Sequence, residues 1–195
     1  MDKGVQTRDA ILDTGVEVAF SVGLGGLTIG ALAERRRMSK SGLFAHFRSK
    51  EALQLAVLER ARETFTDLVL RPALAAPRGE PRLRELFERW LTYGSKRIPG
   101  VCLFVKAATE FDEQPGRLRD RLAENHQDML DTIAQVCRTG VSAGHLRADT
   151  DAEQFAHDMY GVLLVFYLTD RLLDDPAAER RTRVAFDALL DAIRT

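Results

Sequence analysis

The sequence contains few cysteines, almost no net charge and no long apolar run. Two cysteines among 195 residues, Cys102 and Cys137, are too few for a disulfide framework and indicate a reducing compartment. The N-terminus has no apolar signal region, and the longest strongly apolar run, Val162–Leu168, is far shorter than the roughly 20 residues that cross a bilayer. We therefore expect a soluble cytoplasmic protein.

Sequence motifs of common enzyme classes are also missing. The chain has no Cys-x-x-Cys pair, no Gly-rich phosphate loop and no G-x-S-x-G turn. It has no Glu-x-x-His pair, the helical spacing that many all-α metal enzymes use. Glu153 and His157 stand four residues apart, which is better explained as a pair on a helix surface. An enzyme is therefore the weaker alternative, and we expect no metal and no cofactor.

Charge is unevenly distributed along the chain. The formal net charge is −1, yet residues 34–50 carry six basic side chains and one acidic side chain. Residues 61–195 carry 19 basic and 22 acidic side chains. Phosphates attract only the basic groups that reach them, so the local field matters more than the sum. This pattern favours a DNA-facing patch on a mildly acidic body.

Apolar residues recur with a period near 3.6, and no segment alternates with the period of a strand, so we predict an all-α chain of about nine helices. Thr28, Ser39 and Ser49 are candidate N-caps, and Thr150 with Glu153 forms a candidate capping box. The first expected helix ends near residue 23. The following ones cover about 28–36, 39–47, 49–74, 81–97, 103–111, 116–140, 150–173 and 176–195. We predict a helix-turn-helix domain at 1–48, a connecting helix at 49–74 and a C-terminal helical bundle at 75–195.

Two short helices joined by a tight turn, 28–36 and 39–47, describe a helix-turn-helix, whose second helix enters the major groove of DNA. The order of motifs over residues 7–58 resembles the TetR family of bacterial transcriptional regulators. The segments that carry this resemblance are Leu27-Thr28-Ile29, Ala31-Leu32-Ala33, Met38-Ser39-Lys40, Leu43-Phe44, His46-Phe47 and Ser49-Lys50-Glu51-Ala52-Leu53. The remainder of the chain is similar to the family only in its length and helical character.

The resemblance implies a DNA-binding surface around the second short helix. Thr28 and Lys50 are expected to bind phosphates, whereas Leu43 and Phe47 are expected to hold the helix in the core. Lys40, Ser41 and Gly42 are expected to lie nearest the base edges. The full expected set is Thr28, Arg37, Ser39, Lys40, Ser41, Gly42, Phe44, His46 and Lys50. The alternative is a polar helix cap with a solvated basic face.

Three positions depart from the family pattern. Arg37 stands where the family usually has Gly; with a positive φ it would cost about 1 kcal/mol, or it would add a phosphate contact. Phe44 replaces the more usual Tyr and removes a hydroxyl that could touch a phosphate. Gly42 replaces a common Thr and removes a side chain near the bases. With these changes, we expect Lys40, Ser41 and Arg37 to supply more of the sequence-specific contacts to DNA.

The C-terminal region is expected to bind a ligand and to dimerise. An apolar pocket with a few polar groups is indicated by Trp90, Tyr93, Cys102, Phe104, Phe111, His126, Met129 and Tyr160. His126 and Cys102 have the alternative of being ordinary core residues. The resemblance implies dimerisation through the last two helices, with Phe155, Met159, Val162, Phe166, Leu189 and Ile193 as interface candidates; the alternative is ordinary bundle core.

The function that the resemblance implies is sequence-specific regulation of transcription. We expect a homodimer on a palindromic operator of double-stranded DNA, and a repressor that a small apolar effector releases. An activator, or a scaffold that has kept the fold without binding DNA, are the alternatives left open. The effector, the operator and the regulated genes are not encoded in these motifs.

Overall fold

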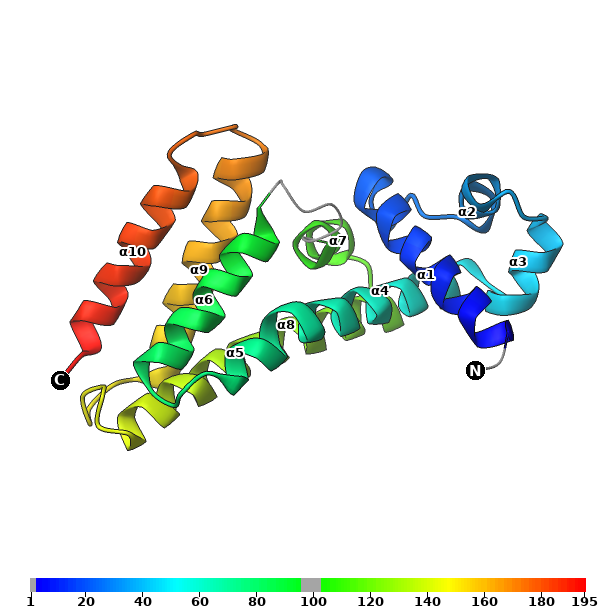
Figure 1. The fold of residues 1–195 in the computed structure, drawn as a ribbon. Coiled ribbons are helices and arrows are strands. Elements are labelled where there is room, and N and C mark those ends of the chain that lie inside the picture. Colours follow the sequence, from blue (N-terminus) through cyan, green and yellow to red (C-terminus); the bar gives the residue numbers. More distant parts are fainter. Residues whose placement is uncertain (1–2, 96–102) are drawn as a thin grey trace. The chain divides into compact units, whose positions relative to one another are not determined.

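The computed structural model describes residues 3–95 and 103–195, and it confirms the all-α class. Apart from one isolated bridge between Leu146 and Arg194, the described residues form helices and turns (Figure 1). None of these helices is both long and apolar enough to cross a membrane. In chain order they are α1 (Lys3–Val22), α2 (Ile29–Arg36), α3 (Lys40–Phe47), α4 (Lys50–Phe65), the π-helical turn η1 (Thr66–Leu70), α5 (Arg71–Ala75), α6 (Glu80–Gly94), α7 (Leu103–Phe111), α8 (Arg117–Ser142), α9 (Ala152–Arg171) and α10 (Ala178–Ile193).

The connecting helix is continuous but changes its pitch near its end. α4, η1 and α5 follow one another without a gap, as the expected helix over 49–74 requires. Pro72 has no N–H for the carbonyl of Leu68, and the N–H of Arg71 bonds instead to the carbonyl of Thr66, five residues back. Arg89 donates to the Leu68 carbonyl at 3.5 Å. When α4, η1 and α5 are counted as one helix, the described residues form nine helical segments.

Two compact units share these helices, and they divide the chain differently from the expected boundaries at 48 and 74. Within the described residues, unit 1 draws on Met1–Thr64 and Pro99–Glu124, and unit 2 on Phe65–Ile98 and Asn125–Thr195. α7 therefore packs with the helix-turn-helix. The reason is a shared core, because Leu103 of α7 is buried in the same cluster as Leu43 of α3.

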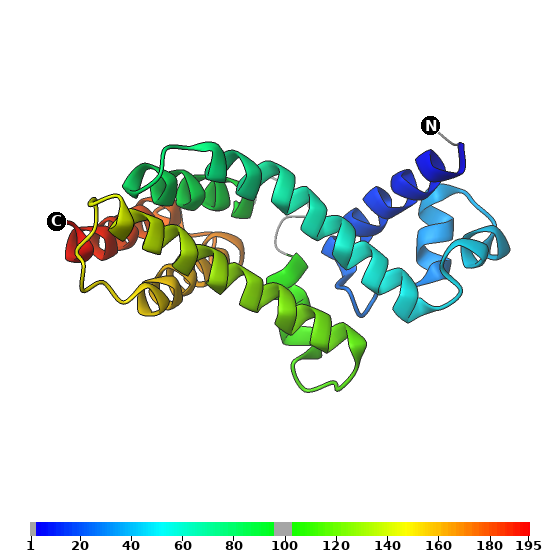
Figure 2. The ribbon, with the colours of Figure 1, turned by 90° about the horizontal axis from the view of Figure 1, so that it is seen from below.

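Unit 1 groups α1, α2 and α3 with α4 beside α1 (Figures 1 and 2). Gly15 allows α1 to approach α4 closely, since a Cβ at Gly15 would lie 2.5 Å from Cγ2 of Val57. Ile11, Leu32 and Leu58 are fully buried nearby. These apolar contacts hold the two short helices against α1 and α4, and leave the polar face of α3 outside.

The three predicted N-caps of unit 1 are confirmed. The side chain of Thr28 accepts a hydrogen bond from the N–H of Ala31 at 3.0 Å, and Ser39 accepts one from Gly42 at 3.1 Å. Ser49 accepts one from the N–H of Ala52 at 3.0 Å. Each cap satisfies a donor that the first turn of its helix leaves free, which explains why α2, α3 and α4 begin where they do.

Unit 2 is a bundle in which α6 and α10 both pack against α9 (Figure 1). The rings of Phe87 on α6 and Phe186 on α10 stack with centroids 3.8 Å apart. Phe166 of α9 is 1% exposed. The predicted capping box of α9 needs one correction: Asp151, not Thr150, is the N-cap and accepts from the N–H of Gln154 at 2.9 Å.

Candidate DNA-binding site and effector region

The turn between α2 and α3 is built around Arg37 in the left-handed region. Its φ of 53° and ψ of 39° confirm the positive φ considered for this position. The N–H of Arg37 bonds to the carbonyl of Glu34 at 3.1 Å, and that of Met38 bonds to Ala33 at 2.9 Å. These bonds satisfy two carbonyls in the last turn of α2, and three residues connect it to α3.

Helix α3 presents one polar face and buries the other. Leu43 is fully buried and Phe47 is 4% exposed, which confirms their predicted core roles. Phe44 is 53% exposed. Among the expected DNA-contacting residues the structure leaves Gly42 half-buried and exposes all of the others, namely Thr28, Arg37, Ser39, Lys40, Ser41, Phe44, His46 and Lys50.

A cationic and hydroxyl pair lies at the N-terminus of α2. A Cβ placed on Gly30 would lie 3.5 Å from Cε and 3.8 Å from Nζ of Lys40, and 3.8 Å from Oγ1 of Thr28. The ammonium of Lys40 and the hydroxyl of Thr28 therefore both lie beside Gly30, which has no side chain. Free N–H groups of the first turn, a hydroxyl and an ammonium are the donors that bind a phosphate.

Lys50 has a contact inside the protein. Its Nζ donates a hydrogen bond of 2.6 Å to the carbonyl of Gly25, in the loop between α1 and α2. The side chain is exposed, so an ammonium with three donors keeps others for solvent or phosphate. The contact makes Lys50 a structural residue as well as a candidate phosphate ligand.

Unit 2 brings together part of the expected effector pocket. The rings of Trp90 and Tyr160 have centroids 5.6 Å apart, and His126 is hydrogen-bonded through Nδ1 to the hydroxyl of Tyr160. Phe65, which was not among the expected residues, lies between Trp90 and Tyr93 with ring centroids 5.1 Å and 5.3 Å away. Met129 is half-buried on α8.

The other expected pocket residues lie elsewhere. Phe104 and Phe111 of α7 belong to unit 1, where they pack against its buried core. Cys102 lies outside the described residues. The second thiol, Cys137, is fully buried, and burial raises its pKa to about 11, so it stays a protonated thiol at neutral pH.

One polar residue in the C-terminal region was missed. Asn125 is 2% exposed, and among the described residues neither its Oδ1 nor its Nδ2 has a hydrogen-bond partner. The sequence contains a signal, because Asn125 interrupts the apolar stripe that Leu118, Leu122 and Ile133 form on α8. A buried carboxamide without partners is costly unless something else satisfies it.

Matches to known proteins cover both parts of the chain. Residues 11–57 match the family described as bacterial regulatory proteins, tetR family. Residues 79–186 match the tetracyclin repressor-like C-terminal domain, which spans more than half of the chain. The chain belongs to the TetR family. It is a DNA-binding transcriptional regulator and not an enzyme, as the resemblance implies.

Individual proteins similar to this TetR-family chain are also transcriptional regulators. The HTH-type transcriptional repressor NemR of Escherichia coli (strain K12) is 26% identical over 140 residues, covering 69% of this chain and 68% of NemR. A TetR transcriptional regulator from Chloroflexus aurantiacus has a TM-score of 0.86 at 22% identity, covering 100% of this chain and 99% of that one. AibR, solved with isovaleryl coenzyme A and operator DNA, has a TM-score of 0.70 at 22% identity and covers 91% and 96%.

The expected dimer residues of this TetR-family chain occupy two different environments. Phe155, Met159 and Phe166 are 4%, 0% and 1% exposed, so they lie in the core of unit 2 and are not available to a second copy. The helix period alone does not separate these residues from an outer stripe, because α9 is apolar on more than one face. Val162, Leu189 and Ile193 are half-buried.

A different set of apolar side chains forms the outer face of α9 and α10. Val165, Leu168 and Val184 are 58%, 51% and 61% exposed. A shallow groove of about 420 Å³ lies beside them, and its lining is Gly161, Val162, Val165, Thr169, Asp175, Ala178, Arg181, Thr182 and Ala185. Several of these residues are small.

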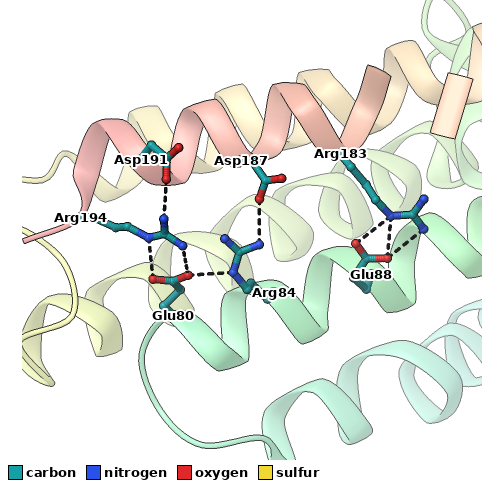
Figure 3. A network of polar contacts seen from close by, with 7 residues as sticks. All are labelled: Glu80, Arg84, Glu88, Arg183, Asp187, Asp191 and Arg194. Atoms are coloured by element: carbon teal, nitrogen blue, oxygen red, sulfur yellow. Dashed lines mark hydrogen bonds and ion pairs between the residues drawn. The ribbon is translucent and has the colours of Figure 1, made fainter. Parts of the chain in front are cut away.

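Ion pairs fasten α10 to α6 along the edge of this bundle (Figure 3). Arg84 donates to Glu80 at 2.7 Å and to Asp187 at 2.8 Å. Arg183 donates to Glu88 with N–O distances of 3.0 Å to 3.2 Å. The spacing of four residues on each helix aligns opposite charges across the pair, which fixes the position of α10 beside α6.

Proposed function

We propose that this protein is a dimeric repressor that a small, mainly apolar effector releases from a palindromic operator. One observation carries the proposal. α3 exposes Ser39, Lys40 and Ser41 while Leu43 and Phe47 anchor its opposite face in the core. A short helix with an exposed polar N-terminus and a buried anchor suits insertion into the major groove.

The phosphate contacts are assigned to the N-terminus of α2. Thr28 and Lys40 both lie beside Gly30, where the free backbone N–H groups of the first turn add further donors. Ser41 and Gly42 then face the base edges, with Lys40 at their border. Arg37, exposed at the turn, is placed to reach the DNA backbone beside α3.

The effector site is assigned to the aromatic group of unit 2. Trp90, Tyr93, His126, Met129 and Tyr160 supply apolar area with a few polar atoms. Asn125, the neighbour of His126 on α8, has a buried carboxamide without a partner among the described residues, and we include it as a group that an effector with both a donor and an acceptor would satisfy. The AibR complex, which holds a ligand and operator DNA, supports pairing these two kinds of site on one fold.

Dimerisation is assigned to the outer face of α9 and α10 around Val165, Leu168 and Val184. A contiguous apolar surface between two helices marks a protein interface. Two copies related by a two-fold axis would present two α3 helices to half-sites about one turn of DNA apart. A repressor of this kind acts on chromosomal DNA, and we place it in the cytoplasm.

The experiment that tests the proposal is selection of bound DNA from a random double-stranded pool. A palindromic consensus, lost when candidate small molecules are added, is the expected result. A consensus without two-fold symmetry would overturn the dimeric mode, and recovery of an unenriched pool would overturn sequence-specific binding. Transcription from a promoter that carries the consensus then separates a repressor from an activator.

A further inference from the structure

The loop between α1 and α2 is held by charged and amide side chains from two other helices. The N–H of Gly25 donates a hydrogen bond of 2.6 Å to Oε2 of Glu110 on α7. The carbonyl of the same residue accepts the 2.6 Å bond from Lys50 Nζ on α4. Gln54 of α4 donates to the carbonyl of Leu24 at 2.7 Å. Both polar groups of the Leu24–Gly25 peptide unit are thus held, the carbonyl by Gln54 of α4 and the N–H by Glu110 of α7.

The backbone of this loop is suited to a carboxylate. Gly23 has a φ of +83°, and a Cβ at that position would lie 2.4 Å from Oε1 of Glu110. A Cβ at Gly25 would lie 3.1 Å from Oε2. Side chains at these two positions would push the carboxylate away, so the glycines and Glu110 form one arrangement.

A second contact from α7 fixes the end of α1. Lys106 donates from Nζ to the carbonyl of Phe20 at 2.8 Å, and the same ammonium lies 5.5 Å from the centroid of the Phe20 ring. The carbonyls in the last turn of a helix have no partner within it, and a cation there also suits the helix dipole. Lys106 and Glu110 are one helical turn apart, so α7 holds α1 and the loop together.

We propose that Glu110 is a positioning residue for DNA binding, acting through the Leu24–Gly25 peptide unit; this inference rests on the DNA-binding function proposed for unit 1. The loop leads directly to Thr28, the N-cap of α2, and Lys40 of α3 lies beside Gly30 in the first turn of that helix. Fixing Gly25 therefore fixes the phosphate-binding end of α2. Glu110 touches no DNA itself and contributes by reducing the freedom of the groups that do.

The test compares three variants for binding to the selected operator at one salt concentration. Glu110→Ala removes the acceptor and should weaken operator binding by about tenfold, the effect of one charge-assisted hydrogen bond. Glu110→Gln keeps an oxygen that can accept from Gly25 and should recover most of the affinity. Glu113→Gln removes the same charge from an exposed side chain nearby and should bind as the unaltered protein does.

A readout independent of DNA is amide hydrogen exchange over residues 23–28. Glu110→Ala should speed exchange there, while exchange in α6, α9 and α10 of unit 2 stays unchanged. Unchanged exchange together with operator affinity equal to that of Glu113→Gln would overturn the positioning role. Should the unaltered protein bind no DNA, the proposed function fails, while the exchange data still show whether Glu110 holds the loop.

Discussion

Arg194, the residue after α10, donates hydrogen bonds to both carboxylate oxygens of Glu80, the first residue of α6 (Figure 3). The two residues are 114 positions apart in the chain. Glu80 also accepts from Arg84 within its own helix. The hydrogen bond from Arg194 and then that from Arg84 outweigh the effect of burial and lower the pKa of Glu80 to about 2.

Acid should therefore weaken the joint between α6 and α10. The pKa of Glu80 is lower in the folded protein than its ordinary value of 4.5, so its carboxylate stabilises the fold at pH values above 4.5. This contribution is lost as the pH falls from 4.5 through about 2. Glu80→Gln should lower stability at pH 7 by about 1 kcal/mol, because the pair is partly solvated. The difference from the unaltered protein should shrink between pH 4.5 and pH 2 as the carboxylate becomes protonated. Urea unfolding at pH 7, 4 and 2 measures it, and a difference that does not change with pH would contradict the assignment.

The turn at Arg37 is expected to be strained. A non-Gly residue with a φ of 53° costs about 1 kcal/mol, so Arg37→Gly should raise stability by up to that amount. Arg35→Gly is the matched control, since it removes the same charge inside α2 and should lower stability by about 1 kcal/mol. Thermal unfolding of both variants should give shifts of opposite sign. A loss of stability in Arg37→Gly would show that the arginine side chain outweighs the strain.

Lys40 is expected to neutralise a phosphate. Its ammonium lies near Thr28 at the N-terminus of α2, so Lys40→Ala should reduce the slope of log affinity against log salt by about one per protomer. Operator and non-specific DNA should weaken alike. Arg71→Ala in α5, an exposed cation of unit 2, should leave the slope unchanged. Equal slopes for Lys40→Ala and the unaltered protein would exclude the phosphate contact.

The outer face of α9 and α10 should carry the dimer. Val165→Glu places a charge on a side chain that is 58% exposed in the protomer, and burial of that charge between copies should weaken association at least about 100-fold. Leu68→Glu, at a side chain 52% exposed in η1, is the matched control and should leave the dimer intact. Sedimentation at micromolar concentration measures both. A dimeric Val165→Glu variant would move the interface elsewhere.

The helix-turn-helix could be predicted because its signals are local. Thr28, Ser39 and Ser49 each bond to an N–H three residues later, so the residue type and the spacing determine where the helices begin. Thr150 and Asp151 are adjacent candidates for one cap, and propensity does not decide between them. The geometry of the backbone before α9 selects Asp151.

Long-range packing could not be predicted in the same way. Glu110 and Gly25 are 85 residues apart, and no periodic pattern links a carboxylate on one helix to a glycine loop. α9 carries apolar residues around most of its circumference, so its sequence does not show that Phe166 is buried while Val165 is exposed. That choice depends on where α6 and α10 lie. The placement of Phe104 and Phe111 in unit 1 has the same origin.

Gln54 and Asn125, the two buried side-chain amides among the residues whose burial is described, should respond in opposite ways to the same substitution. Gln54 is 5% exposed and donates to the carbonyl of Leu24, so Gln54→Leu leaves that carbonyl unsatisfied and should cost about 1–3 kcal/mol. Asn125 is 2% exposed without partners among the described residues, so Asn125→Leu removes a desolvation penalty and should be neutral or stabilising by about 1 kcal/mol. Urea unfolding without any effector measures both changes. Equal destabilisation would show that Asn125 serves the fold, whereas the expected contrast leaves its carboxamide free to serve the effector.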